Sequence, residues 1–323
     1  MAQKKDLPFS QVLDLLFGEE KLPIHLLYRL SDMTPEEFGE FKSRWPHVTD
    51  ERRRVLVRHM ADLSENNFVV DFSPVFGYCL VDPQPAVRLA ALDGVWDSTN
   101  VLLIEPIIQL LKHDADLEVR AASAAALAHY VLMAEWGELP GRVSGPIVEA
   151  LLEVYESRET AVSIRRAALE ALGAATHPRI ATLIEDAYEG DDPDLQLSAI
   201  FAMGNTADSR WLPILLDEML NSSAEIRQEA ARAAGAIGHK DAVPHLIDLL
   251  ADENEDVVLA AIGALAEIGG EEAYNALSSM ADDEAYEAFH EVLEEALESM
   301  DWLADFDWLS LSEVDFEDPF DLE

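Results

Sequence analysis

The chain has 323 residues, of which 49% are hydrophobic, so it holds enough apolar side chains to bury a core. Its formal net charge of −42 comes from 64 acidic and 22 basic residues. Such a surface repels nucleic-acid phosphates and anionic lipid headgroups, so we expect neither direct nucleic-acid binding nor membrane binding. The single cysteine, Cys79, excludes an intramolecular disulfide and a cysteine-based zinc site.

The first residues do not fit a signal peptide, because their apolar run is interrupted by Asp14 and Glu19. No stretch approaches 18 uninterrupted apolar residues. From these two features we expect a cytoplasmic protein.

Residues 1–80 are predicted to form an N-terminal helical cap. Thr34, followed by Pro35 and two glutamates, has the pattern of a capped helix start. A further helix is expected to begin at Thr49 or Asp50. The repeat that dominates the rest of the chain is weak here, as is typical of a terminal unit with one face in water.

The middle of the chain contains a sequence repeat. Four apolar anchor residues follow one another at intervals of 31 residues, and each is followed four positions later by alanine. The anchors are Ile164, Leu195, Ile226 and Val257, and the alanines are Ala168, Ala199, Ala230 and Ala261. A fixed period of this length indicates a repeat architecture, in which each unit packs only on its neighbours.

Each repeat is predicted to form a helical hairpin. Apolar or small residues at the anchor and at positions +4, +7 and +8 lie on one face of a helix. The small alanines allow helices of adjacent repeats to approach closely. Gly173, Gly204 and Gly235 stand nine residues after the anchors, where we expect the first helix to end. Pro213 and Pro244 are expected in the first turn of the second helix, where a missing N–H breaks no hydrogen bond.

Two earlier units, anchored at Val87 and Val119, extend the array over residues 81–281. The next anchor follows Val119 after 45 residues instead of 31, so this unit carries extra residues near 134–146. Their glycines and prolines predict a loop between the paired helices. The chain is therefore expected to be all-α, a right-handed α-solenoid of stacked antiparallel helix pairs with repeats of about 31 residues.

The insertion near residues 134–146 offers a candidate binding site at Trp136 and Arg142. Insertions in repeat proteins form loops on one face, where partners often bind. Many such insertions have no function, and the sequence favours neither interpretation.

The C-terminal region of the chain has two predicted segments, a helix over residues 282–304 that caps the last repeat and an acidic aromatic tail over residues 305–323. No Lys or Arg follows Lys240, while residues 241–323 hold 26 Asp and Glu. Large aromatic side chains stand among these acids, and our candidate partner-binding residues are Trp302, Phe306, Trp308, Phe316 and Phe320.

This composition favours a tail that docks its aromatics into a groove of a partner. The alternatives are a frayed, solvated tail and a tail that folds back on the arginine-richer N-terminal half, where Arg52, Arg53, Arg54 and Arg58 cluster.

Arginines one residue after the repeat anchors are Arg88, Arg120, Arg165 and Arg227. They could form a basic stripe for an acidic partner. We favour a structural role, in which they pair across neighbouring repeats with acidic residues of the preceding turns, such as Asp82, Asp114 or Asp116, and Glu225.

Four short segments carry a resemblance to a known family: VRLAAL at 87–92, VRAASAAAL at 119–127, IRRAALEALG at 164–173 and IRQEAARAAGAIG at 226–238. They resemble HEAT-like repeats, in the short form shared with phycobilin lyases and deoxyhypusine hydroxylase. The whole chain is also similar to bacterial HEAT-repeat proteins, a similarity that implies no function. The resemblance implies architecture first, since HEAT arrays serve mainly as scaffolds and adaptors.

The enzymatic relatives imply residues that can be sought in this chain. Deoxyhypusine hydroxylase holds two irons with His-Glu pairs on several first helices, and the matching place here has Gln228 and Glu229. The one His-Glu pair of the chain, His290 and Glu291, lies outside the clear repeats. A bilin lyase has no short motif to seek.

We therefore expect a non-enzymatic scaffold or adaptor that uses a HEAT-repeat surface and the tail to bind a protein partner with a basic patch. No catalytic, cofactor-binding or metal-binding residue is predicted, and the sequence does not indicate an oligomeric state. The alternative is an enzyme or enzyme accessory of the bilin lyase or hydroxylase type.

Overall fold

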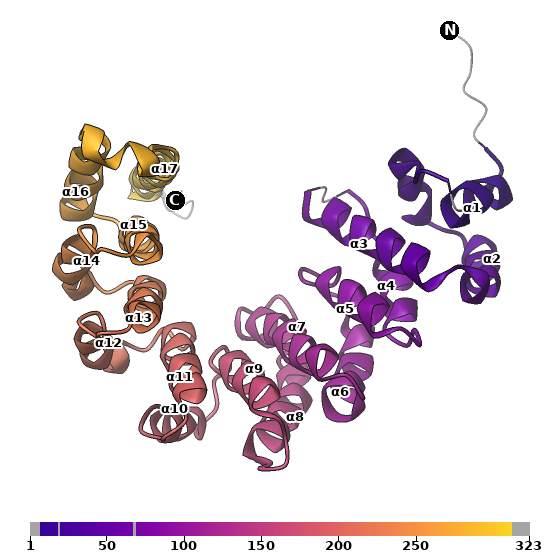
Figure 1. Cartoon of the computed structure of the whole chain (residues 1–323), viewed down its shortest axis with the longest axis horizontal. Helices are drawn as coiled ribbons and strands as arrows, with labels where there is room; N and C mark the ends of the chain where they lie inside the picture. The colour runs from indigo at the N-terminus through magenta and orange to yellow at the C-terminus, as the bar shows by residue number, and fades with distance from the viewer. Residues whose placement is uncertain (1–6, 19, 67–68, 312–323) are drawn as a thin grey trace, which may run out of the picture. The chain divides into compact units, whose positions relative to one another are not determined.

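The computed structural model describes residues 7–18, 20–66 and 69–311, and all regular secondary structure in these ranges is helical (Figure 1). The chain divides into two compact units, residues 1–183 and residues 184–323, which we call unit 1 and unit 2. Each unit is described by itself below.

Unit 1 is built mainly from helix pairs. Its helices are α1 (Phe9–Phe17), η1 (Ile24–Leu30), α2 (Pro35–Arg44), η2 (Trp45–His47), α3 (Asp50–Asn66), α4 (Ser73–Cys79), α5 (Pro85–Asp93), η3 (Val101–Leu103), α6 (Ile104–His113), α7 (Leu117–Glu135), η4 (Gly141–Val143), α8 (Ser144–Glu156) and α9 (Val162–Leu172). The first helices α3, α5, α7 and α9 pack on one another in chain order, and α6 packs on α8 behind them.

Unit 2 repeats this arrangement of helix pairs. Helix α10 (Ile180–Tyr188) contains the boundary between the units. It is followed by α11 (Pro193–Asn205), η5 (Ser209–Trp211), α12 (Leu212–Glu218), α13 (Ala224–Ile237), η6 (Lys240–Ala242), α14 (Val243–Leu249), α15 (Glu255–Ile268), α16 (Glu271–Ala281), η7 (Glu284–Phe289) and α17 (His290–Leu311). One layer of unit 2 consists of α11, α13, α15 and α17. A second layer, made of α12, α14 and α16, packs along one side of the first (Figure 1). This is an α-solenoid of stacked helix pairs, as the 31-residue period predicted.

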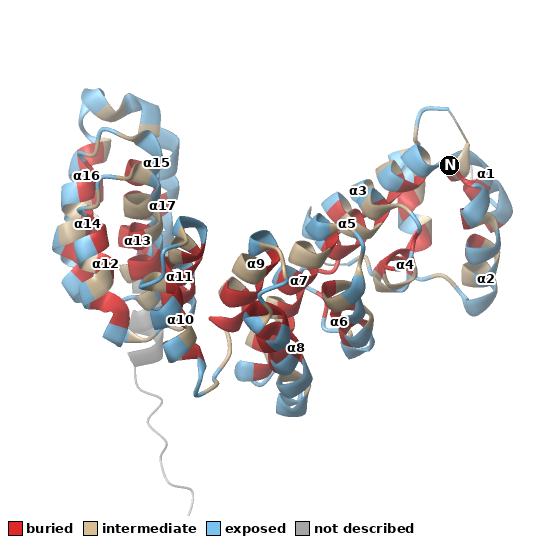
Figure 2. Ribbon diagram, turned by 60° about the horizontal axis from the view of Figure 1, so that its bottom comes forward, coloured by how far each residue is buried: buried red, intermediate tan, exposed pale blue. Residues whose placement is uncertain are grey.

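The predicted anchors lie in the core between the helices. Ile164, Leu195 and Val257 are buried, and Ile226 is half-buried. The alanines four residues later, Ala168, Ala199, Ala230 and Ala261, are all fully buried. Figure 2 shows the buried residues on the sides of the helices that face their neighbours. The periodic positions therefore form the core that joins one repeat to the next.

Local sequence signals fix where the helices begin. Thr34 and Glu37 form a capping box at the start of α2, because each side chain accepts a hydrogen bond from the other residue's backbone N–H. Asn254 caps α15 in a simpler way, accepting from two backbone N–H groups of the first turn. Pro213 and Pro244 lie in the first turns of α12 and α14, as expected.

Three glycines were expected to mark the ends of first helices, and two of them have a different role. Gly173 follows α9, but Gly204 and Gly235 lie inside the last turns of α11 and α13. A Cβ at Gly204 would lie 2.7 Å from Cα of Ala233, and one at Gly235 would lie 2.8 Å from Cα of Ala264. These two glycines therefore permit close packing of successive first helices.

The expected loop near residues 134–146 is wrong in extent. Helix α7 continues to Glu135 and has 19 residues where α13 has 14, and α8 has 13 residues where α14 has 7. The extra residues thus lengthen the two helices, because apolar positions such as Val131, Ala134 and Ile147 continue the buried face of the pair. Only a short connection remains between α7 and α8, and it contains the predicted site residues Trp136 and Arg142.

The ends of the array also differ from the expected boundaries. Helix α3 packs on α5 as one first helix on the next, so repeat-like packing begins near residue 50. At the other end η7 occupies residues 284–289, and α17 continues past residue 304 to Leu311. The described outer face of α17 carries the exposed acids Glu291, Glu294, Glu295 and Glu298. None of the helices in the described ranges has the length and apolar character needed to span a membrane.

Candidate functional site: a groove between two repeats of unit 2

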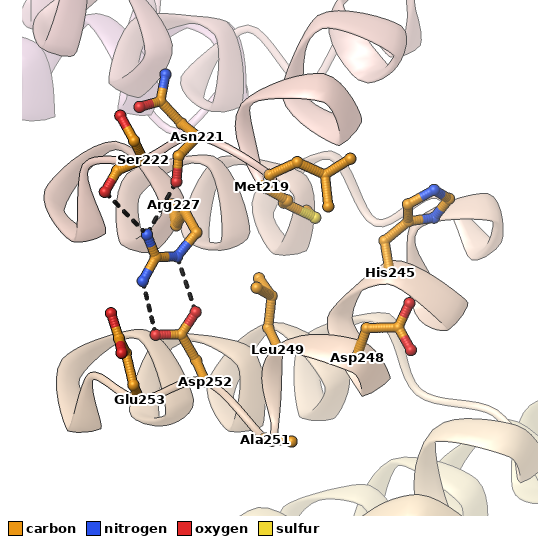
Figure 3. Close-up of a pocket in the computed structure, with 11 residues that line it drawn as sticks. Met219, Asn221, Ser222, Arg227, His245, Asp248, Leu249, Ala251, Asp252 and Glu253 are labelled. Carbon is orange, nitrogen blue, oxygen red and sulfur yellow. Dashed lines mark hydrogen bonds and ion pairs between the residues drawn. The ribbon is translucent and has the colours of Figure 1, made fainter.

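A groove of about 580 Å³ lies between the end of α12, the start of α13 and helix α14 (Figure 3). It is lined by residues of two successive repeats, namely Met219, Leu220, Asn221, Ser222, Arg227, His245, Asp248, Leu249, Ala251, Asp252 and Glu253. The volume lies within the range of ordinary ligand sites in proteins.

The apolar part of the groove comes from the ends of the two second helices. Met219 and Leu249 are 1% and 6% exposed, and they lie next to each other in Figure 3. Leu220 is 79% exposed, although it is a large apolar side chain in a turn. The groove therefore offers apolar surface to water at a place where the repeat itself does not cover it.

The polar part of the groove is organised by an ion pair between repeats. Arg227, in the first turn of α13, donates from Nε and Nη2 to the two carboxylate oxygens of Asp252, both at 2.8 Å. Its Nη1 donates to the backbone carbonyls of Asn221 and Ser222. The side chains of Arg227 and Asp252 are only about a tenth exposed, so this pair is fixed in place.

Asp252 also caps the turn before α15. Its carboxylate accepts from the backbone N–H of Asn254, in addition to the two bonds from Arg227. The hydrogen bond from Arg227 is the main reason why the pKa of Asp252 is lowered from its ordinary value, and the same bond raises the pKa of Arg227. Both groups are therefore charged at neutral pH.

A second network supports the α12 side of the groove. Tyr188 of α10 donates to Oε1 of Glu218, and the amide of Asn221 donates to Oε2 of Glu218 at 2.6 Å. Burial is the largest cause that raises the pKa of Tyr188 to about 12, and the hydrogen bond to Glu218 adds to it. Because Asn221 also accepts from Arg227, the two networks hold the turn after α12 in one conformation.

Three further groups of the groove have no internal partner. The carboxylates of Asp248 and Glu253 form no hydrogen bond or ion pair within the region of the chain that the structure describes. Figure 3 shows Asp248 and His245 at one end of the groove and Glu253 at the other, with Leu249 between them. The Nδ1 atom of His245 is shielded from solvent and lacks a hydrogen-bond partner among the described residues.

The pair at Arg227 belongs to a series. In unit 1, Arg53 pairs with Asp82 at 3.2 Å, and Arg88 pairs with Asp114 at 2.7 Å. In each pair the arginine lies in the first turn of a first helix, and the aspartate lies three residues before the next first helix. Arg88 does pair across neighbouring repeats, as predicted, but with Asp114 of the following turn and not with the carboxylate of Asp82 in the preceding one.

Two details of this prediction need correction. Arg227 pairs with Asp252 of the following turn, not with Glu225. Arg120 and Arg165 donate from Nε to the backbone carbonyls of Leu111 and Tyr155, because no aspartate stands at the matching place of the next turn.

The arginine cluster of residues 52–58 is neutralised within unit 1. Arg52 donates to backbone carbonyls at the end of α1, and Arg53 is buried beside Asp82. Arg54 pairs with Glu51, and Arg58 lies between Asp62 and Asp93. These arginines therefore already have partners within unit 1, and Arg54 and Arg58 remain about half exposed.

The predicted site residues of the insertion lie in the connection between α7 and α8. Trp136 directly follows α7 and is 68% exposed, and Arg142 lies in η4 and is exposed. The side chain of Arg142 has no hydrogen bond or ion pair to any described residue, and no contact joins it to Trp136. Both belong to unit 1, whereas the groove belongs to unit 2.

The predicted site residues of the tail are only partly covered by the structure. Trp302, Phe306 and Trp308 belong to α17, so residues 305–311 are helical where we expected a tail. Phe316 and Phe320 lie outside the described residues.

Residues 180–262 and 212–298 match the family model for HEAT repeats. Residues 180–298 of the chain are therefore HEAT repeats. The comparison with curated proteins finds no relative of the chain by sequence. Among its described residues there is no group of three or more His, Cys, Asp or Glu placed to hold a metal ion.

The comparison with solved structures also finds matches to this chain. The complex of CpcE and CpcF of phycocyanin lyase from Nostoc sp. PCC7120 matches with a TM-score of 0.53 and 17% identity, over 88% of this chain and 96% of that one. Human deoxyhypusine hydroxylase matches with a TM-score of 0.32 and 21% identity, over 71% of this chain and 96% of that one. At 17% identity the likeness to the CpcE and CpcF complex is one of fold and brings no activity with it.

Proposed function

We propose that this HEAT-repeat array is a non-enzymatic scaffold that binds a protein partner through a basic patch on that partner. The observation that carries the proposal is the unequal neutralisation of charge. Many arginines before Lys240 pair with carboxylates, as at Arg53, Arg88 and Arg227. Beyond Lys240, by contrast, every charged side chain other than histidine is acidic. A surface of this kind attracts cations and speeds their association.

Charge attraction alone gives weak binding, and the groove adds apolar contact to it. Its exposed Leu220 and its carboxylates form a mixed surface of the type that contributes specific contact in protein interfaces. Trp136 and Arg142 remain candidate contacts in unit 1, and the aromatic residues from Trp302 onward remain candidates at the C-terminus. A cytoplasmic location also remains a prediction.

The test is affinity capture from the native host with the full chain as bait, at low and at high salt, followed by titration calorimetry with each purified partner. We expect a partner rich in Lys or Arg whose dissociation constant rises steeply with salt. A purified partner whose affinity is insensitive to salt would contradict the proposed recognition. Stoichiometric iron or a covalent bilin in the purified protein would contradict the non-enzymatic half of the proposal.

A further inference from the structure

We propose that the groove between α12 and α14 binds an extended segment of the partner in which a lysine or arginine stands next to an apolar residue. This inference rests on the proposed function and names the site and the chemistry of its ligand. The groove brings the exposed apolar side chain of Leu220 together with unpartnered carboxylates in one cavity of unit 2.

The charge of the groove selects a cation. The residues that line the groove include three carboxylates, those of Asp248, Asp252 and Glu253, and a single guanidinium, that of Arg227. Because Asp252 takes two hydrogen bonds from Arg227, that pair is neutral as a unit. Asp248 and Glu253 form no ion pair among the described residues, and Arg227 attracts Glu253 only at longer range, so both lack a paired counter-charge. A cationic side chain of a partner supplies it, whereas a phosphate or a carboxylate ligand would be repelled.

The apolar surface distinguishes this site from a merely acidic patch. Leu249 lies between the two unpartnered carboxylates in Figure 3, with Met219 beside it and the exposed Leu220 in the adjoining turn. Leu249 and Met219 are buried, so the apolar surface offered to a ligand is that of Leu220. Lysine and arginine carry long aliphatic stems that pack on such surface while the charged end reaches a carboxylate. A neighbouring apolar residue of the same segment covers the remaining surface around Leu220.

The walls of the groove are already fixed before a ligand binds. The α12 side is held through Tyr188, Glu218 and Asn221, and the α14 side is held through Arg227 and Asp252. A preorganised site loses little conformational entropy on binding, so a short segment suffices to occupy it.

The experiment is an NMR titration of the full-length protein with the acetylated peptide Gly-Lys-Leu-Lys-Gly at low ionic strength. We expect the largest shifts at the amide of Leu220 and at the imidazole of His245, which lines the groove. The peptide Gly-Lys-Ser-Lys-Gly, with the same charge and no large apolar side chain, is expected to bind about fivefold more weakly.

The decisive comparison uses two double variants with the same change of charge. Asp248→Asn with Glu253→Gln removes the unpartnered carboxylates of the groove, and we expect it to raise the dissociation constant about tenfold. Asp282→Asn with Glu287→Gln changes two exposed carboxylates of unit 2 that do not line the groove, and we expect less than about a twofold effect. None of these four side chains makes a hydrogen bond within the described residues, so both variants should fold normally.

The outcomes separate this inference from the proposed function. Equal weakening by the two double variants would overturn the groove as the site and leave general attraction of a basic partner standing. Absence of any peptide shift near Leu220 and His245 would likewise overturn the groove alone. The proposed function fails separately, if no partner captured by the full chain depends on salt.

Discussion

Arg227 and Asp252 form a two-pronged ion pair, in which Nε and Nη2 of the guanidinium each donate to one carboxylate oxygen at 2.8 Å. The two residues belong to successive repeats, 25 positions apart. The pair therefore joins two repeats by a polar contact while the alanines and glycines of the first helices join them by close packing.

We expect Arg227→Met to lower the free energy of unfolding by about 2 to 3 kcal/mol, because it leaves the largely buried carboxylate of Asp252 without its main partner. Asp252→Asn should have a similar effect. The double variant should lose less than the sum of the two, with a coupling energy of about 1 to 2 kcal/mol from urea unfolding. Additive losses would show that the pair contributes nothing beyond its separate hydrogen bonds.

Gly235 and Gly263 provide opposite expectations for the same substitution. A Cβ at Gly235 would meet Ala264 of the next helix, so Gly235→Ala should destabilise the protein by about 1 to 3 kcal/mol. Gly263 lies within α15 with no atom within 4 Å of a Cβ, so Gly263→Ala should stabilise by about 0.5 to 1 kcal/mol. Thermal melting followed by circular dichroism measures both. A gain at Gly235 would refute the close approach of α13 and α15.

The phenol of Tyr188 is expected to lose its proton at a higher pH than an ordinary tyrosine. Burial and the hydrogen bond to Glu218 raise its pKa to about 12, above the ordinary value of 10.0. A raised folded-state pKa means that the contribution to stability is complete below about pH 10 and is lost as the pH rises toward 12. Ultraviolet titration of phenolate absorbance should show that Tyr188→Phe removes a group from the high end of the curve. Loss from the region near pH 10 would contradict the assignment.

Cys79 is expected to resist alkylation in the folded protein. It is fully buried, and burial raises the pKa of its thiol well above the ordinary value, so little thiolate forms and none reaches solvent. Iodoacetamide should therefore modify the native protein far more slowly than the protein unfolded in urea, as followed by mass spectrometry. Comparable rates in the two states would show that α4 does not pack as described.

Much of the fold could be predicted from the sequence, because the buried positions of a repeat recur at a constant interval along the chain. The anchors such as Val257 and the alanines such as Ala230 are positions at which a larger or polar residue would push adjacent helices apart, so their period reports packing directly. The role of Gly235 was harder to predict, because glycine suits both the end of a helix and a close approach. Only the position of Ala264 decides between these two roles.

The groove could not be predicted from the sequence, because folding alone brings its lining residues together. Its lining comes from residues about 30 positions apart, and none of them belongs to a motif. One signal was available, since Leu220 stands where the next repeat has Ala251, and a large apolar residue in an exposed turn is not needed by the core. The excess of carboxylates hid the rest, because nothing in the sequence distinguishes Asp248 and Glu253 from the many other acids of this region.

Helix α13 packs on α11 and on α15 through the same kind of contact, between a glycine and an alanine. Gly204 meets Ala233, and Gly235 meets Ala264, with 29 positions between the partners in both cases. Removal of residues 205–235 would therefore bring Gly204 against Ala264 across a junction that the molecule already uses. The length of this array can change in whole repeats during evolution, or in the laboratory, without the invention of a new interface.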